Sequence, residues 1–168
     1  SLVGDKKGFL LESYDKNYDR YTFFGKEPEE IISSRGNALV ITKNDGTQEV
    51  RNGNPLERLK EYYSEFDIVK DNEELSFSGG LVGNLGYDFV RYAEVLPDNN
   101  PDEIGIETVQ MMLMTKFIMV DHVAETLTGI ILGEDTPEGR KKSLEEAEEL
   151  IRQALANKGR APEKNFTH

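Results

Sequence analysis

Short apolar runs separated by turn residues dominate the first fifty residues of the chain. Residues 8–13 and 20–25 are predicted as strands, the second because it is rich in aromatic and β-branched side chains. The polar residues 14–19 between them are predicted as a turn. Asp45-Gly46 separates two further runs and is typical of a tight β-hairpin.

Two later segments have the period of an amphipathic helix. Asn54 before Pro55 places a capping side chain ahead of a residue suited to the first helical position, and apolar residues then recur at helical spacing. Thr136-Pro137 begins a second helix in the same way. Its apolar positions are predicted to form one stripe, made of Leu144, Ala147, Leu150, Ile151, Ala154 and Leu155.

Two apolar regions lie between these helices. Residues 78–88 are dense in glycine, which indicates a strand that another backbone approaches closely. Residues 107–122 contain all the methionines and are predicted as one long strand paired with residues 127–132. The order strands, helix, strands, helix predicts an α+β domain, an antiparallel sheet with helices packed on it.

Composition narrows the classes of protein that fit this pattern. The 168 residues and 37% hydrophobic content suit one compact domain, and the net charge of -12 argues against a nucleic acid or an anionic membrane as partner. The absence of cysteine excludes disulfides and thiolate metal sites. The longest apolar stretch is far shorter than the roughly 20 residues of a membrane span, so a cytoplasmic protein is predicted.

Candidate catalytic groups are scarce. The only histidines are His122, expected to be an exposed turn residue beside Asp121, and the terminal His168. The glycines of residues 79–86 match neither the dinucleotide fingerprint nor the P-loop. We therefore predict no catalytic residue and no metal site within this chain.

Four blocks, in the same order, resemble the N-terminal part of anthranilate synthase component I. Phe9-Leu10-Leu11-Glu12-Ser13 resembles its Leu-Leu-Glu-Ser signature, and residues 20–25 with Pro28 resemble its Arg-Tyr-Ser-Phe-Ile-Gly block. Residues 79–88 resemble its glycine-rich block, and residues 115–122 resemble a strand ending in Asp-His. The resemblance implies that residues 1–168 are the N-terminal domain, half of a two-domain sandwich, without the catalytic domain.

The reaction of the family indicates which ligands and partners this chain is expected to need or lack. The whole subunit converts chorismate to anthranilate and pyruvate with magnesium, using ammonia from a glutamine amidotransferase partner. In the family the C-terminal domain binds both chorismate and the metal. The resemblance therefore implies that this chain alone binds no cofactor and is inactive, and that its partners are its own C-terminal catalytic domain and the amidotransferase subunit.

The resemblance also implies a feedback site for L-tryptophan. It places Ser13 in that site with Leu11 and Glu12, and strand alternation puts Leu11 and Ser13 on one face and Glu12 on the other. Further contacts are expected from the segment that follows, from Tyr18, Arg20 and Tyr21. Without the resemblance, a core leucine and a strand-end hydroxyl would be the simpler interpretation. Residues 15–19 differ from the glycine-containing turn that the family has there.

Two other functions fit the same sequence. Component I of aminodeoxychorismate synthase resembles this family in fold, although Glu12 favours anthranilate synthase because the sister family more often has Asp there. A free-standing amino-acid-binding regulatory module is the third hypothesis.

Overall fold

A computed structural model of the chain describes residues 7–12, 20–67, 75, 77–95 and 107–156. It divides into two compact units. Unit 1 comprises residues 1–28 and 114–168, and unit 2 comprises residues 29–113. Each unit has its own sheet and is described by itself.

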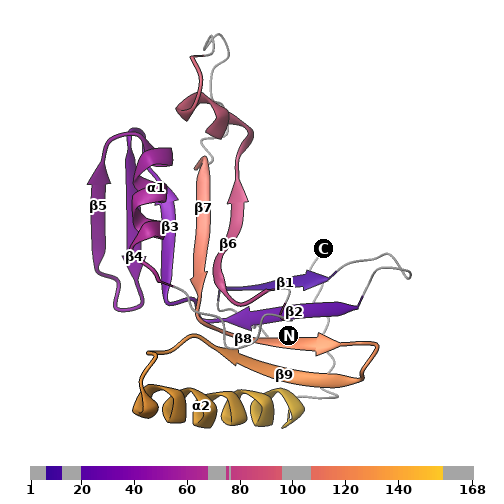
Figure 1. The fold of residues 1–168 in the computed structure, drawn as a ribbon. Helices are drawn as coiled ribbons and strands as arrows, with labels where there is room; N and C mark the ends of the chain where they lie inside the picture. Colours follow the sequence, from indigo (N-terminus) through magenta and orange to yellow (C-terminus); the bar gives the residue numbers. More distant parts are fainter. Residues whose placement is uncertain (1–6, 13–19, 68–74, 76, 96–106, 157–168) are drawn as a thin grey trace, which may run out of the picture. The chain divides into compact units, whose positions relative to one another are not determined.

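Unit 1 contains a four-stranded sheet with one long helix beside it (Figure 1). The strand order is β1-β2-β8-β9, and every neighbouring pair is antiparallel. Helix α2 packs mainly against β9, where a Cβ at Gly129 would lie 3.0 Å from the Ala147 carbonyl oxygen. The bounds are β1 Gly8–Glu12, β2 Tyr21–Lys26, β8 Lys116–Asp121, β9 Thr126–Ile131 and α2 Pro137–Ala156.

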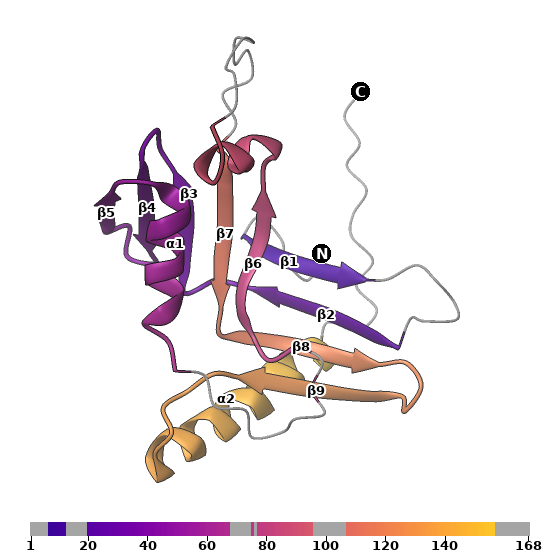
Figure 2. The same cartoon turned by 45° about the horizontal axis from the view of Figure 1, so that its top comes forward.

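Unit 2 contains a five-stranded sheet in the order β5-β4-β3-β7-β6, with α1 against it and a short 3-10 helix, η1, after β6 (Figure 2). The pairs β3–β4, β3–β7 and β4–β5 are antiparallel. The bounds are β3 Glu30–Ser34, β4 Ala38–Lys43, β5 Gln48–Asn52, α1 Pro55–Ser64, β6 Gly80–Leu85, η1 Tyr87–Tyr92 and β7 Val109–Met114.

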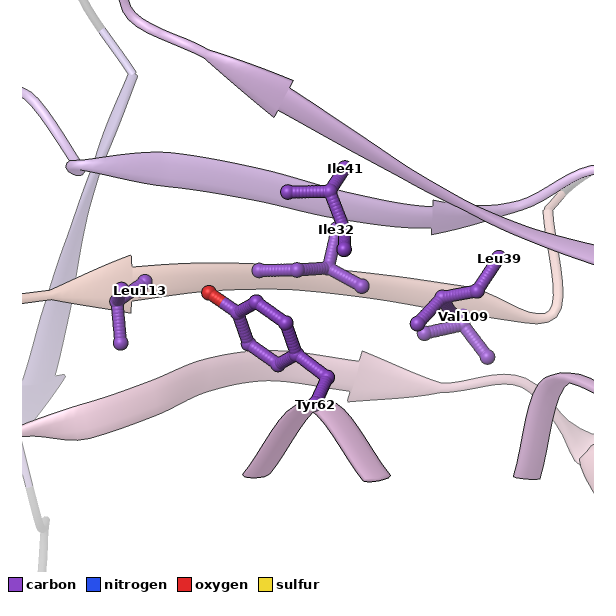
Figure 3. Close-up of a cluster of buried hydrophobic side chains, with 6 residues drawn as sticks. All are labelled: Ile32, Leu39, Ile41, Tyr62, Val109 and Leu113. Carbon is purple, nitrogen blue, oxygen red and sulfur yellow. The ribbon is translucent and has the colours of Figure 1, made fainter. Parts of the chain in front are cut away.

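The core of unit 2 forms where Tyr62 of α1 meets the sheet (Figure 3). The Tyr62 hydroxyl donates a hydrogen bond to Glu30 Oε2 at 2.6 Å. Burial and this bond to a carboxylate raise the pKa of Tyr62 above its usual range. The buried residues of the cluster are Ile32, Leu39, Ile41, Tyr62, Val109 and Leu113.

Several sequence predictions are confirmed. Asn54 Oδ1 accepts the Leu56 N–H at 2.9 Å and caps α1, and Gly46 has φ +84° in the turn between β4 and β5. The predicted close approach in the glycine-rich strand occurs at Gly83, where a Cβ would overlap the Gln110 carbonyl oxygen. The α+β class with antiparallel sheets is also confirmed.

The prediction of one long strand over residues 107–122 is wrong. The run forms β7 and β8, which pair in two different sheets on either side of Thr115. The apolar pattern continues through the break because both strands bury side chains, so hydrophobicity does not mark it. As a result the structure has two sheets in two units where the sequence predicts one.

Two smaller differences concern single elements. The strand β3 was not predicted, because its two isoleucines stand between polar residues. The apolar stripe predicted for α2 is narrower than expected, since Leu144 and Leu155 are exposed while Ala147, Leu150 and Ile151 are partly buried. The polar turn at residues 14–19 lies outside the described residues. In the described part of the chain, no helix is long and apolar enough to cross a membrane.

Candidate functional site

The residues predicted to bind a ligand lie at one end of β1 and β2 in unit 1. Leu11 and Glu12 end β1, Arg20 directly precedes β2, and Tyr21 begins it. Ser13 and Tyr18 lie outside the described residues. The site can therefore be built from four of the predicted positions and from the strands around them.

The strand register separates these positions into two faces of the sheet. Leu11 lies opposite Phe23, and Glu12 lies opposite Thr22. Because residues directly opposite each other share a face, Leu11 and Phe23 lie on one face and Glu12 on the other. Tyr21 shares the face of Phe23, since it is two residues away. The structure thus brings Leu11, Phe23 and Tyr21 together but not Glu12.

A row of aromatic rings runs along the face that contains Leu11. The Phe9 and Phe117 ring centroids are 6.0 Å apart, those of Phe117 and Phe23 are 6.4 Å apart, and those of Phe23 and Tyr21 are 6.1 Å apart. A Cβ at Gly25 would lie 2.8 Å from Phe9 Cε1 and 2.9 Å from Phe117 Cβ. Glycine at this position therefore leaves the space that the row of rings occupies.

An ion pair stands at the Tyr21 end of this row. Arg20 Nε donates to Asp121 Oδ2 at 3.1 Å, and Arg20 Nη2 donates to the same oxygen at 2.9 Å. The guanidinium carbon of Arg20 also lies 4.9 Å from the centre of the Tyr21 ring, which is within the range of a cation–π contact. Arg20 is therefore held by a carboxylate and an aromatic ring at once.

Asp121 is itself fixed by the turn that follows β8. Its Oδ1 accepts the N–H groups of Val123 and Ala124, each at 3.0 Å. The bonds from Arg20 and from this backbone lower the pKa of Asp121 to about 2. The carboxylate is thus charged at any ordinary pH.

His122 makes two contacts with the start of β2. Its backbone N–H donates to the Arg20 carbonyl oxygen at 2.8 Å, and its Nε2 lies 2.8 Å from Thr22 Oγ1. The residue is exposed in the turn after β8, as the sequence predicts. These contacts tie the β8 turn to β2 on the side of the sheet that contains Glu12.

Sequence reasoning missed Phe23, Thr22 and the pairing of Asp121 with Arg20. Phe23 lies inside the Arg-Tyr block, so its place between Leu11 and Tyr21 follows once β1 and β2 are paired. Asp121 is 101 positions from Arg20, and no local signal links the two. Only the register of β2 with β8 brings them together.

The surface at this end of the sheet combines an apolar and a polar part. Leu11 is 45% exposed beside the partly buried Phe23 and Tyr21, so a flat apolar group has side chains to pack on. The polar groups of Arg20 and Asp121 adjoin it. Among the described residues, no group of three or more histidines or acids could hold a metal ion.

Comparison with known proteins identifies relatives along most of the chain. Anthranilate synthase component 1 of Acetivibrio thermocellus is 31% identical over 125 residues, which cover 73% of this chain and 25% of that protein. Its counterpart in Acinetobacter calcoaceticus is 30% identical over 142 residues, covering 79% and 28%. No protein-family model matches the chain.

A solved structure has the same fold. The crystal structure of anthranilate synthase component I from Streptococcus pneumoniae TIGR4 superposes with a TM-score of 0.62 and 24% sequence identity, covering 91% of this chain and 32% of that one. The chain spans about a quarter to a third of the length of these proteins. Over that span, the chain belongs to the anthranilate synthase component 1 family.

Proposed function

We propose that this chain is the N-terminal, tryptophan-binding domain of an anthranilate synthase large subunit. The observation that supports the proposal is the shared face of Leu11, Phe23 and Tyr21, because these residues come from the two blocks that resemble the family's feedback site. The full-length subunit would make anthranilate and pyruvate from chorismate in tryptophan biosynthesis. A cytoplasmic location belongs to the same proposal.

The indole and the charged end of L-tryptophan each have a proposed partner near β1 and β2. The indole packs on Leu11 and on the rings of Phe23 and Tyr21, which together present an apolar surface. Ser13 supplies a hydroxyl for the charged end of the amino acid. Glu12 belongs to the proposed site by its place in the Leu-Leu-Glu-Ser block, and it lies on the face of β1 opposite to Leu11.

The remaining functions of the subunit are assigned to parts that this chain does not contain. Chorismate and magnesium would bind in the C-terminal catalytic domain, and a glutamine amidotransferase subunit would supply ammonia. The 168-residue chain alone is therefore expected to make no anthranilate, with either ammonia or glutamine. The check is the fluorescence of anthranilate in reactions with protein free of host enzyme, and a signal above the blank contradicts the proposal.

A tryptophan titration of the full-length subunit tests the regulatory role. A hydrogen bond to a charged group contributes about 1.5–3 kcal/mol, so Ser13→Ala should raise the inhibitory tryptophan concentration by roughly ten- to a hundredfold. Ser64→Ala is a matched control, because Ser64 lies at the exposed end of α1 and donates only to the Glu61 carbonyl oxygen. Identical inhibition curves for wild type and Ser13→Ala would show that this serine binds no tryptophan.

A further inference from the structure

The Arg20 side chain of the candidate site is exposed, yet its head group has several contacts. It is 54% exposed, whereas the Asp121 side chain is 8% exposed. A long side chain in such an exposed place samples many rotamers unless its head group is fixed. Here Arg20 Nε donates to Asp121 Oδ1 at 3.3 Å and Nη2 donates to Oδ2 at 2.9 Å, so two donors meet two oxygens in the forked geometry that best restricts a guanidinium.

Asp121 can restrict Arg20 because it does not move freely itself. Two backbone N–H groups of the following turn hold Oδ1, and the His122 N–H binds the Arg20 carbonyl oxygen. Arg20 is thereby fixed at its backbone and at its head group by the same turn. The guanidinium in turn lies over the Tyr21 ring, which packs on Phe23.

We propose that Asp121 is a positioning residue of the tryptophan site: it holds the Arg20 guanidinium over Tyr21 and so sets the orientation of that ring beside Leu11. This inference rests on the proposed function. It adds a residue of β8 to a site otherwise made from the β1 and β2 region. Asp121 acts through Arg20 and Tyr21 and does not itself touch the ligand.

The charges of Arg20 and Asp121 distinguish this positioning role from a simpler one, in which Arg20 pairs directly with the ligand carboxylate. Because the Asp121 carboxylate lies 2.9 Å from Arg20 Nη2, the positive charge of Arg20 is already offset. If Arg20 were the charge partner of the ligand carboxylate, removing the Asp121 charge would strengthen tryptophan binding. If Asp121 positions the ring, the same change weakens binding, so the sign of the effect decides between the two roles.

The variants are chosen to keep the turn intact. Asp121→Asn retains an oxygen that accepts the Val123 and Ala124 N–H groups but removes the charge that holds Arg20. Arg20→Met removes the guanidinium and leaves every turn bond of Asp121 in place. Asp135→Asn is the control, because Asp135 pairs with Arg140 at 2.7 Å in an exposed ion pair of the same unit.

The chain contains no tryptophan, so the indole emission of added L-tryptophan is the only indole signal in a titration. Asp121→Asn and Arg20→Met should each raise the dissociation constant by about five- to tenfold, and the double variant should add little. Asp135→Asn should bind as wild type does. Thermal melting of each variant shows that the loss of binding does not follow from unfolding. The same variants are measured in the full-length subunit by equilibrium dialysis with labelled L-tryptophan.

A second ligand separates the positioning role from a contact between Arg20 and the ligand carboxylate. Tryptamine lacks the carboxylate, so a positioning role predicts the same fold-loss for tryptamine as for L-tryptophan. Unchanged or tighter tryptophan binding by Asp121→Asn, or a loss confined to L-tryptophan, overturns the inference while the proposed function stands. No binding of L-tryptophan by the wild-type chain and full-length subunit overturns the proposed function itself.

Discussion

The two units both pack an α-helix on an antiparallel sheet, yet they place their polar side chains differently. In unit 2 these side chains join one element to another. Ser34 Oγ accepts the Val109 N–H at 3.0 Å, Tyr92 Oη lies 2.9 Å from Thr108 Oγ1, and Asn54 Nδ2 donates to the Tyr92 carbonyl oxygen at 2.7 Å. These bonds link β3, β7, η1 and the start of α1, so they serve the fold of the unit.

In unit 1 polar side chains also join elements, but one group of them, between β2 and the turn after β8, lies at an end of the sheet beside the candidate site. Arg20, Asp121, His122 and Thr22 form a connected group beside the exposed Leu11. The buried side chains of this unit include the rings of Phe9 and Phe117, which continue the aromatic row, whereas the core cluster of unit 2 is largely aliphatic. The difference indicates that the polar side chains of unit 2 named above stabilise its fold. In unit 1, Arg20 and Asp121 also lie where a ligand has access.

Removing one ring from the aromatic row of unit 1 should give the largest effect on stability. Phe117 is fully buried and contacts the rings of both Phe9 and Phe23, so Phe117→Ala should lower the free energy of unfolding by about 3–5 kcal/mol. Denaturant titration measures the loss, and hydrogen exchange shows where it falls. Exchange should rise in β1, β2, β8 and β9.

Ile32→Ala is the matching change in unit 2, at another fully buried position. It should cost about 2–5 kcal/mol and raise exchange in β3, β4 and β7. If either substitution raised exchange equally in both sheets, the two units would form one cooperative block. The comparison between them would then fail.

A side chain at Gly25, next to the Phe9 and Phe117 rings, should give the next largest effect on stability. A methyl group at Gly25 would overlap Phe9, Phe117 and the Met114 side chain, so Gly25→Ala should destabilise the protein by about 1–3 kcal/mol. Gly86→Ala in unit 2 is the control, because its Cβ would meet its nearest neighbour at 3.4 Å. A loss at Gly86 as large as that at Gly25 would contradict the role assigned to the rings.

The two helix caps provide a smaller and more exact comparison. Asn54 both caps α1 and binds the Tyr92 carbonyl oxygen, so Asn54→Ala should cost about 1–2 kcal/mol. Thr136 Oγ1 accepts the Gly139 N–H at 2.9 Å and makes an exposed cap of α2, for which about 0.5–1 kcal/mol is expected. Equal losses on denaturant titration would show that the Tyr92 contact adds nothing.

The smallest expected effects are those of pH, and they differ in direction between the units. The pKa of Asp121 is lowered to about 2 in the folded protein. Its contribution to the free energy of unfolding is therefore present above about pH 4 and is lost as the pH falls towards 2. The pKa of Tyr62 is raised in the folded protein. Its contribution to the free energy of unfolding is therefore present below about pH 10 and is lost as the pH rises beyond that value.

Stability profiles of Asp121→Asn and Tyr62→Phe against wild type measure these two effects. The Asp121→Asn difference should shrink only in acid, and the Tyr62→Phe difference should change only in alkali. Between about pH 5 and pH 8, both differences should be flat. A slope in that range would show that other groups titrate with folding.

The sequence predicts elements best where the signal is local. Asp45-Gly46 and Asn54-Pro55 specify a turn and a helix start through their own backbone preferences, and the structure has both. The break at Thr115 has no such signal, because what decides it is which strands pair with β7 and with β8. The same reason applies to the site: the faces of Leu11 and Glu12 follow from strand alternation, but the Asp121 partner of Arg20 requires the tertiary pairing.

The way unit 1 is divided along the chain has a consequence for how the protein is made. Unit 2 lies between the two stretches of unit 1 in the sequence, so β2 must wait for β8 to leave the ribosome, whereas unit 2 is nearly complete once Leu113 has emerged. Contacts as distant in sequence as Arg20 and Asp121, 101 positions apart, also form slowly because closing so long a loop costs entropy. We expect cotranslational folding to begin in unit 2, and arrested nascent chains should show protease resistance in residues 30–64 before residues 21–26. The end of the sheet proposed to bind tryptophan is then completed only after unit 2 has folded.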